Sequence, residues 1–284
     1  MENTNFLTPA QDIQLKAFRQ LDITTLVPAI YNTFFSESSQ LDSLSLHADP
    51  HTDFLSYQDL QNLSFLCEAN NLSLSSTIGG CEANRDLYEL ASLKVSSIQV
   101  PAVESVFSLK KFIDSYNHTY ANPLSGSNPS VQFYPMSPSS LFALLETSHI
   151  QNISCPKSLI IDRNLFLTYF PDDTSLSNYI NQSFSKTASV LPCTICGGIE
   201  QSKALDILNI YNCERISTKM FSVKVSSIKN VDLLPELVSA LLILEMQVVD
   251  LLIKSRSIVT NQLSKRLSEL INYSQYSMLK LNQI

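Results

Sequence analysis

The amino-acid sequence predicts an α/β barrel followed by a C-terminal helical extension. The chain has 284 residues, and one such barrel typically needs roughly 250. Short apolar runs of β character alternate with longer helical patterns, which is typical of parallel βαβ units. Residues 230–284 are almost wholly helical in pattern. We therefore expect a TIM-type (β/α)8 barrel with helices added at its C-terminal end.

Seven segments have the pattern of barrel strands. Each is a short run of apolar and β-branched residues, and helical patterns lie between most of them. The eighth strand is expected from Ile23–Ile30, near the start of the chain, which would make the first strand of the barrel irregular. The seven segments are Ser43–Leu46, Leu72–Ile78, Ser97–Pro101, Val131–Tyr134, Leu159–Ile161, Pro192–Cys196 and Arg215–Thr218.

The chain divides into three parts. Residues 1–40 are expected to form a helical lead-in, with a helix that begins at the capping residue Thr8 and ends near Leu21. Residues 41–229 supply the barrel. Residues 230–284 supply C-terminal helices, which we expect to pack on the barrel or on a neighbouring subunit.

An apolar face in the C-terminal part supports the second possibility. Leu237, Leu241, Leu244, Val248 and Leu251 recur at helical spacing. This face is longer than one barrel helix usually needs, and apolar patches of that size tend to be covered. We therefore expect a homo-oligomer that associates through these helices.

Composition and charge argue against several classes of protein. The net charge is −7 and no dense cluster of Lys and Arg occurs, so nucleic acid is not an expected partner. The most apolar stretch, Leu237–Leu252, contains Glu245 and Asp250, and it is too short and too acidic to cross a bilayer. The start of the chain lacks the pattern of a signal peptide, and the six cysteines form no disulfide framework. We expect a cytoplasmic protein without a membrane partner.

Two glycine pairs mark one end of the predicted barrel. The sequence contains only five glycines, and four of them form the pairs Gly79-Gly80 and Gly197-Gly198. Each pair directly follows a predicted strand, where barrel enzymes place their active sites and where glycine allows the backbone to approach a ligand. A tight strand-to-helix turn explains a single pair equally well. The two pairs together favour a ligand-binding rim.

Acidic residues follow two of the predicted strands. Glu82 comes shortly after Gly79-Gly80, and Glu104 follows the strand that ends at Pro101. Each carboxylate could take part in chemistry at the mouth of the barrel. Each could also cap the helix that begins there, because a negative charge is stabilised near a helix N-terminus.

Two further motifs have the residue types of metal sites. His47 and His51 flank Asp49 and Asp53 after the first predicted strand, although an ordinary solvated loop looks the same in sequence. Cys193 and Cys196 form a lone CxxC motif inside a predicted strand, with no second ligand pair in sight. We expect these two cysteines to be reduced and free of zinc.

Several of these segments resemble one known family. Ile78–Glu89 closely resembles part of the HpcH/HpaI aldolase/citrate lyase family, a branch of the phosphoenolpyruvate/pyruvate-domain barrels. Val95–Ile113 is similar to that family's next strand and helix. Cys193–Ile199 looks like a late strand with a glycine-rich turn, and Arg215–Lys219 follows in the expected order. The resemblance covers roughly residues 41–275 and is specific only at Ile78–Phe112.

The resemblance implies a metal-dependent carbon–carbon lyase acting on pyruvate-like 2-oxo acids. In the family, a Glu and an Asp at two successive strand ends hold Mg²⁺ or Mn²⁺, and a basic residue stabilises the enolate. Arg163 matches the family, and Arg163, Glu82 and Glu104 are therefore the candidate catalytic residues. Lys219, like both glycine pairs, is a candidate substrate-binding residue, since Ser217-Thr218-Lys219 stands where the family commonly has Glu-Thr-Arg.

The chain departs from the family at the metal ligands. The metal Glu is expected after Tyr134, where the sequence has Met136, and no Asp or Glu occurs between Asp114 and Glu146. The metal Asp is expected near Leu165, and only Asp162 lies close enough to serve as a weak candidate ligand. Mg²⁺ and Mn²⁺ need anionic oxygen ligands. We therefore expect no metal cofactor.

Three functions remain open from the sequence. The first is a carbon–carbon lyase scaffold with a degenerate metal site and impaired or altered activity, whose partner is a small 2-oxo acid or another anion. The second is an active lyase with a rearranged site. The third is a non-catalytic structural or regulatory partner of an active paralogue.

Overall fold

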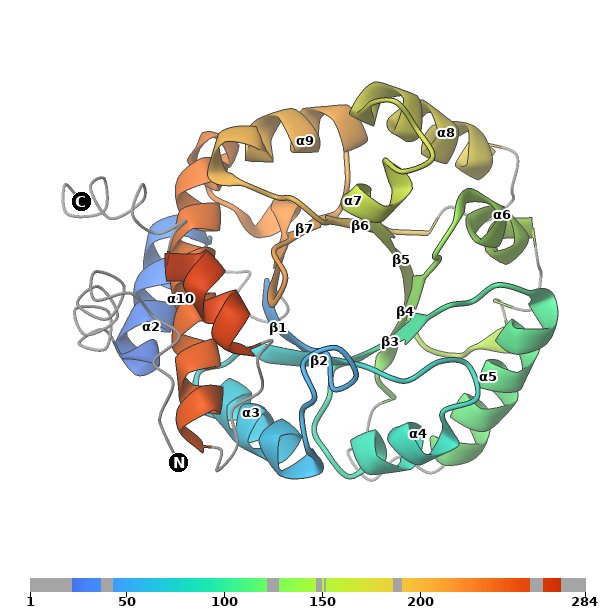
Figure 1. Ribbon diagram of the computed structural model, residues 1–284, viewed down its shortest axis with the longest axis horizontal. Coiled ribbons are helices and arrows are strands. Elements are labelled where there is room, and N and C mark those ends of the chain that lie inside the picture. Colours follow the sequence, from blue (N-terminus) through green and yellow to red (C-terminus); the bar gives the residue numbers. More distant parts are fainter. Residues whose placement is uncertain are drawn as a thin grey trace.

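Eight strands close into a single barrel in the computed structural model, which describes residues 22–36, 43–121, 128–146, 150, 152–185, 191–255 and 263–271. Neighbours in sequence are neighbours in the barrel, and helices surround the strands (Figure 1). The α/β barrel predicted from the sequence is confirmed. The strands are β1 (Leu44–Ala48), β2 (Ser73–Thr77), β3 (Ser97–Pro101), β4 (Ser130–Tyr134), β5 (Lys157–Asp162), β6 (Cys193–Cys196), β7 (Arg215–Ser217) and β8 (Phe221–Lys224).

The barrel closes through a hairpin instead of an eighth βα unit. Strands β1 to β7 run parallel, and each pairs with the next. Strand β8 follows β7 after a connection of residues 218–220 and runs antiparallel to both β7 and β1. All seven strands predicted from the sequence are present. The irregular strand, however, is the last strand of the barrel and not the first.

The segment Ile23–Ile30, expected as the eighth strand, is helical. It belongs to α2 (Ile23–Phe34), where the Asp22 side chain accepts a hydrogen bond from Thr24 N and caps the first turn. Val27, Ile30 and Phe34 are buried at helical spacing. This segment was expected as a strand because a barrel needs eight strands, but the cap and the helical burial pattern decide the outcome. The predicted helix Thr8–Leu21 lies outside the described residues.

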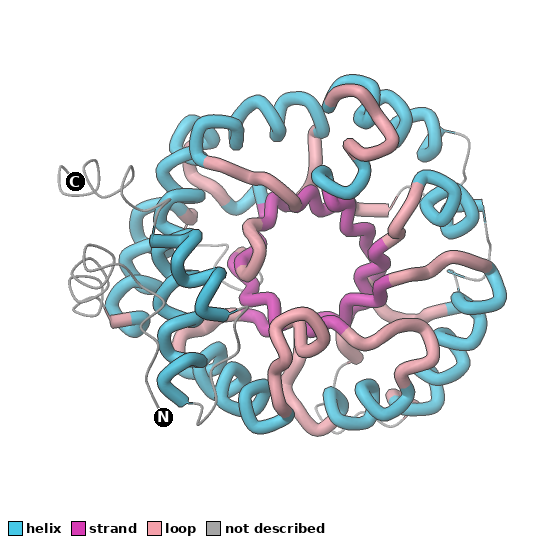
Figure 2. The backbone as a smooth tube through the Cα atoms, in the orientation of Figure 1, coloured by secondary structure: helices cyan, strands magenta, loops and turns pink. Residues whose placement is uncertain are grey.

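Helices follow most strands and form the outer layer (Figure 2). Ser56 opens the first of these after β1 with a capping box that also uses Asp59. A further helical segment covers residues 263–271. The helices are α3 (Tyr57–Ala69), α4 (Asn84–Ala91), α5 (Val106–Thr119), α6 (Pro138–Glu146), α7 (Arg163–Phe166), α8 (Asp173–Ser185), α9 (Ala204–Tyr211) and α10 (Leu234–Ser255), with short 3-10 turns at η3 (Gln201–Lys203), η4 (Val225–Ser227) and η5 (Val231–Leu233).

The C-terminal helices cover one another and the barrel. Leu237, Leu241, Leu244 and Val248 of α10 are buried within the chain, whereas Leu251 is 37 % exposed. Helix α10 packs against α2 and α9, and Figure 1 shows α2 on its outer side. The length of the apolar face, which motivated the predicted subunit interface, is thus explained by contacts within one chain. No helix in the described ranges combines the length and the apolar character needed to span a bilayer.

The inside of the barrel is unusually polar. Side chains alternate along each strand, and the outward-facing Leu46 and Phe133 are fully buried beneath the helices. Barrel interiors are usually filled by Val, Ile and Leu. Here most inward positions carry short or amide side chains, which leave space and hydrogen-bonding groups inside the ring. Inward polar residues include Ser75, Thr77, Gln99, Gln132, Thr194, Ser217 and Ser222.

Candidate functional site

A cavity of about 870 Å³ opens at the end of the barrel where the parallel strands terminate. Its size lies in the usual range for small-molecule sites. Its upper walls come from the segments that follow β1, β5 and β6 and from the β7–β8 hairpin, and its depth is lined by Gln99, Gln132, Ile160, Thr194 and Ser222. The cavity therefore reaches from the mouth into the middle of the barrel.

A chain of hydrogen bonds crosses the inner wall from β1 to β4. The Gln99 Nε2 group donates to Gln132 Oε1 at 3.0 Å, and Thr77 Oγ1 lies 3.1 Å from His47 Nε2. Thr77 also reaches Gln99 Oε1 at 3.5 Å. These side chains face one another because parallel strands place residues in matching register on the same face. The chain fixes the orientation of the amides that line the cavity.

Two polar groups of the cavity wall have no hydrogen-bond partner among the described residues. Thr194 is 4 % exposed, its side chain lines the cavity, and no hydrogen bond of its hydroxyl is found in the described ranges. His47 lines the cavity as well, and its Nδ1 atom is buried without a partner in the same ranges. Burial lowers the pKa of His47, although Asp49 and Asp53 act in the opposite direction. The imidazole is therefore neutral near pH 7.

Asp162 lies at the tip of β5 with both carboxylate oxygens engaged. Oδ2 accepts a hydrogen bond from the Tyr134 hydroxyl at 2.7 Å, and Oδ1 accepts one from Leu165 N at 3.2 Å as the cap of α7. Gly197 packs so closely on this carboxylate that a Cβ atom there would collide with Oδ1. Burial raises the pKa of Tyr134, with the nearby Cys196 and Asp162 adding to the effect, so the phenol remains a hydrogen-bond donor.

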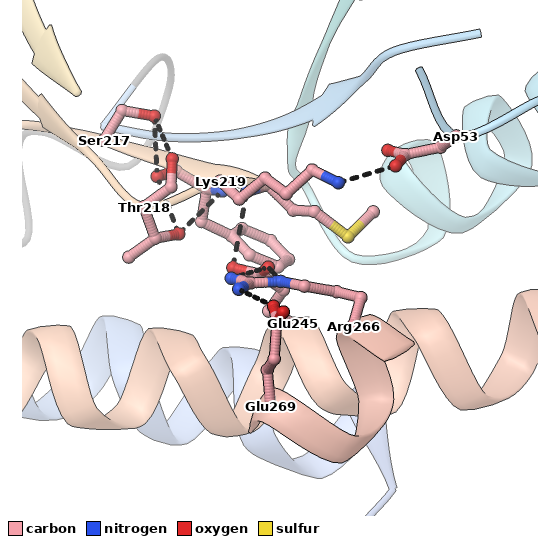
Figure 3. Close-up of polar contacts among 9 residues, drawn as sticks. Asp53, Ser217, Thr218, Lys219, Glu245, Arg266 and Glu269 are labelled. Carbon is pink, nitrogen blue, oxygen red and sulfur yellow. Dashed lines mark hydrogen bonds and ion pairs between the residues drawn. The ribbon is translucent and has the colours of Figure 1, made fainter. Parts of the chain in front are cut away.

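The two cationic side chains at the mouth are each paired with a buried acid. Lys219 Nζ lies 2.6 Å from Asp53 Oδ1, and the Asp53 side chain is only 7 % exposed. Arg266 donates from Nε and Nη2 to Glu245 Oε1, at 2.8 Å and 2.5 Å. Figure 3 shows Lys219 extended toward Asp53 and the Arg266 guanidinium lying on Glu245 of α10. An anion that binds either cation would lie beside the paired acid or displace it.

Of the residues proposed from the sequence as catalytic, substrate-binding or metal-binding through the family resemblance and the glycine pairs, four line this cavity. Gly197 and Gly198 follow β6, Lys219 lies in the β7–β8 hairpin, and Asp162 ends β5. Gly197 and Gly198 both have positive φ, and Cβ atoms there would meet Asp162 and Asn164. The glycine-rich turn therefore allows the β6 loop to cross closely over the end of β5.

Arg163 lies next to this rim, but its side chain contacts the outer helices. Its guanidinium forms two hydrogen bonds with Asp173, at 2.5 Å and 2.8 Å, and the Tyr211 hydroxyl donates to the same carboxylate at 2.7 Å. These contacts join α7 to α8 and α9. Arg163 is not among the residues that line the cavity, and its partner is neither Glu82 nor Glu104.

The two acids proposed for catalysis do not meet at the mouth. Glu82 is exposed and pairs with Lys111 of α5 at 2.6 Å, while the first residue before α4 is Ala83, which provides no side-chain cap. Glu104 is exposed, and the cap of α5 is Ser105. Neither residue lines the cavity. The structure thus separates the three candidate catalytic residues, because each belongs to a different loop-to-helix junction.

The first glycine pair is bound to a neighbouring loop instead of the cavity. Gly79 N donates to Asp86 Oδ2 at 2.7 Å, and the same oxygen lies 2.9 Å from His51 Nε2. A Cβ atom at Gly79 would collide with the His51 ring. Gly79 thus permits a close contact between the β1 and β2 loops, and neither Gly79 nor Gly80 lines the cavity.

The His and Asp cluster after β1 is divided between these contacts. His47, Asp49 and Asp53 reach the cavity, whereas His51 points to Asp86. Asp49 Oδ1 accepts from His51 N and Thr52 N, both at 3.1 Å, as a loop-forming acid does. No group of three or more His, Cys, Asp or Glu side chains arranged to hold a metal ion occurs in the described part of the chain.

The CxxC motif lies within β6, as expected from the sequence. Cys196 lines the cavity, and all six cysteines are free thiols. Burial raises the pKa of Cys196 well above its ordinary value, and the nearby Asp162 and Cys193 raise it further. A thiol with a raised pKa is a poor nucleophile and a poor metal ligand at neutral pH.

The sequence interpretation missed the polar inner wall and the residue that covers it. Gln99 and Gln132 stand between apolar neighbours in Ile98-Gln99-Val100 and Val131-Gln132-Phe133. That alternation was the available signal, since a strand with two apolar faces would read as a continuous apolar run. Arg266 gave no signal, because its place at the mouth depends on how helix 263–271 packs.

Comparison with known proteins adds little beyond the fold. No protein-family model matches the sequence, and no curated protein matches it. A solved structure that does match is the crystal structure of a variant of the citrate synthase SbnG, with 9 % identity and a TM-score of 0.45. The match covers 69 % of this chain and 81 % of that chain. The barrel itself is established by its own strand pairing, in the order β1 to β8.

Proposed function

We propose that this chain is a barrel of the aldolase/citrate lyase kind that binds a small molecule at its mouth without a divalent metal ion. The carbon–carbon lyase activity implied by the family resemblance would then be lost or altered. The observation that carries the proposal is that the Asp162 carboxylate is already hydrogen-bonded within the protein. Both of its oxygens accept hydrogen bonds from the protein, so the one acid near the expected metal position already acts as a helix cap.

The residues present do not fit Mg²⁺ or Mn²⁺. Such an ion needs several oxygen ligands, with carboxylates among them. Tyr134 ends β4, and the residues that follow it, Pro135 and Met136, offer no carboxylate. At the end of β5, Leu165 contributes only its backbone N–H to the Asp162 cap. We therefore derive no chemical step through a metal ion.

The alternative of an active lyase with a rearranged site is less well supported. It requires Asp162, Arg163, Glu82 and Glu104 to act together. Arg163 is held by Asp173, Glu82 pairs with Lys111, and Glu104 points to solvent. A general acid and base must both reach the same substrate. Only Asp162 of these four lines the cavity.

The role as a structural or regulatory partner has also lost its main support. It relied on an unpaired apolar face of the C-terminal helices. Most of that face is buried by the barrel, by α2 and by α9 within the same chain. A well-formed cavity with hydrogen-bonding groups in its depth favours binding of a small molecule.

A calorimetric titration tests the proposal that the cavity binds no divalent metal ion. Mn²⁺ is titrated into the wild-type protein and into Asp162→Ala, each with and without oxalate. We expect no saturable heat at micromolar Mn²⁺ with either protein. Saturable binding that disappears in Asp162→Ala would show a metal site and contradict the proposal.

A thermal-shift screen tests the proposal that a small molecule binds at the mouth of the barrel. The variant Thr194→Phe places a ring in the depth of the cavity, and circular dichroism checks that it remains folded. A small-molecule library that includes pyruvate, oxalate and phosphate is screened against both proteins. We expect at least one compound to raise the melting temperature of the wild type but not of Thr194→Phe. A library that stabilises both proteins equally, or neither, would contradict a ligand site at the mouth.

A further inference from the structure

We infer, on the basis of the proposed function, that the mouth cavity selects an uncharged, hydroxyl-rich small molecule such as a polyol or a monosaccharide. Among the described residues, the depth of the cavity is lined by no charged side chain and mostly by groups that both donate and accept hydrogen bonds. These are the amides of Gln99 and Gln132 and the hydroxyls of Thr194 and Ser222. Such groups match alcohol hydroxyls, which also donate and accept.

The groups without protein partners point to the same chemistry. The Thr194 hydroxyl and the Gln132 Nε2 group both border the cavity, and neither makes a hydrogen bond within the described ranges. Both groups line the open cavity, so a ligand there can take the place of the solvent that they meet. Thr194, at 4 % exposure, can be reached only from inside the cavity.

His47 adds a neutral ring to the inner wall. Its Nε2 atom contacts Thr77 Oγ1 at 3.1 Å, and burial lowers its pKa. The imidazole therefore places no charge beside the ligand near pH 7.

An anionic ligand would find each positive charge at the mouth, among the described residues, already paired with an acid. Lys219 is paired with Asp53, and Arg266 is paired with Glu245 and lies 3.4 Å from Glu269. Arg215, below the cavity, donates to Ser45 and to Ser222. An anion would therefore have to displace an internal acid or lie beside one.

A cationic ligand is matched only at the opening of the cavity. Asp162 and Asp49 accept hydrogen bonds from uncharged donors, and Glu200 also lines the opening. Among the described residues, no acid lines the depth of the cavity. An uncharged ligand enters that depth without the desolvation cost of an ammonium group.

The test is a thermal-shift and calorimetric comparison of three ligand classes. The uncharged probes are glycerol, erythritol, xylitol, myo-inositol and glucose, the anionic probes are pyruvate and oxalate, and the cationic probes are ethanolamine and putrescine. At about ten times its dissociation constant, a specific ligand should raise the melting temperature by about 2 to 3 °C. We expect this shift with at least one uncharged probe and with none of the charged ones.

Matched variants place the binding in the cavity. Thr194→Val keeps the shape of the side chain and removes the hydroxyl, and it should weaken binding of the uncharged probe about three- to tenfold. Ile160→Val also lines the cavity but changes no polar group, and it should leave the affinity nearly unchanged. Thr194→Phe should abolish binding because its ring fills the space.

Each other outcome has a distinct meaning. A charged probe that binds the wild type and not Thr194→Phe, with no uncharged probe binding, would overturn the ligand class but leave the proposed function standing. No binding by any probe or library compound would overturn both. An uncharged probe that stabilises Thr194→Phe as strongly as the wild type, or that is indifferent to Thr194→Val, would overturn the inference alone.

Discussion

Arg266 and Glu245 form a buried ion pair that joins helix 263–271 to α10 beside the mouth of the barrel. The Arg266 guanidinium donates to Glu245 Oε1 from two nitrogens, and Glu245 is 0 % exposed. The second oxygen of Glu245 accepts from Met220 N in the β7–β8 hairpin at 3.3 Å. One carboxylate thus ties together the hairpin that carries Lys219 and the two helices that lie against it.

Removal of the Arg266 guanidinium should strongly destabilise the protein. In Arg266→Met, Glu245 remains buried with the Met220 N–H as its one remaining partner among the described residues, and such a change typically costs about 3–5 kcal/mol. Urea unfolding measures this loss. Lys265→Met is the control, since Lys265 is 79 % exposed and lies 4.0 Å from Glu269, so it should change stability by less than about 0.5 kcal/mol.

The double variant Glu245→Leu/Arg266→Met separates the loss of the ion pair from the cost of leaving Glu245 buried without Arg266. It removes the buried charge along with its partner, and apolar replacement of a buried pair is often neutral. We expect it to be more stable than Arg266→Met alone. Equal loss in both variants, or less than about 1 kcal/mol lost in Arg266→Met, would show that the pair does not hold the helix in place.

The ion pair between Arg163 and Asp173 should make the protein sensitive to acid. The Arg163 hydrogen bonds hold the pKa of Asp173 below its ordinary value, with Tyr211 contributing in the same direction against the effect of burial. A lowered folded-state pKa gives stabilisation that is fully present above the unfolded value of about 3.9 and is lost as the pH falls through the folded value. Asp173→Asn should therefore be less stable than wild type at pH 7, by about 1–3 kcal/mol.

The difference between wild type and Asp173→Asn should shrink as the pH falls below about 4. Unfolding curves at several pH values between neutrality and this region would show it. Asp232→Asn is the control, because Asp232 is exposed and forms no ion pair with another described residue. A stability difference for Asp173→Asn that stays constant from pH 7 to strongly acidic pH would contradict the assignment.

Gly197 and Gly80 should differ sharply in their tolerance of alanine. Both have positive φ, +82° at Gly197 and +138° at Gly80, so both substitutions carry backbone strain. A Cβ atom at Gly197 would also meet Asp162 Oδ1 and, at 2.9 Å, Asn164 N, whereas nothing lies within 4 Å at Gly80. We expect Gly197→Ala to lose at least about 2 kcal/mol more than Gly80→Ala in denaturant unfolding.

That comparison also tests how the mouth is built. The collision at Gly197 should displace Asp162 from Tyr134, so Gly197→Ala should weaken any ligand bound in the cavity. Gly80→Ala should leave such binding unchanged, because Gly80 does not line the cavity. Equal stability of the two variants would mean that the β6 turn does not depend on close contact with β5.

The sequence was sufficient for most of the barrel because each parallel strand is a short apolar run between helical patterns. It was misleading for the segment before β1 and for the last strand, β8. Ile23–Ile30 has the residue types of a strand but is capped by Asp22 and packs as a helix. Strand β8 has only four residues and follows β7 after Thr218-Lys219-Met220, which contains none of the usual turn-forming residues.

The candidate site was predictable only in part, because strand order places residues at the mouth but does not reveal where their side chains turn. Gly197, Gly198 and Lys219 follow strands directly, so their position at the mouth follows from strand direction. Arg163 also follows a strand, but its long side chain turns away to Asp173 on α8. Strand order cannot reveal such a tertiary contact. The polar inner wall was missed because barrel interiors are usually apolar.

A crystal structure of the protein soaked with manganese and oxalate tests the central claim most directly. The anomalous signal of manganese locates the ion independently of any reaction. We predict no manganese peak within ligand distance of Asp162, with the Tyr134 hydroxyl still bonded to its carboxylate. A manganese ion coordinated by Asp162 and chelated by oxalate at the mouth of the barrel would contradict the account and restore the metal-dependent lyase.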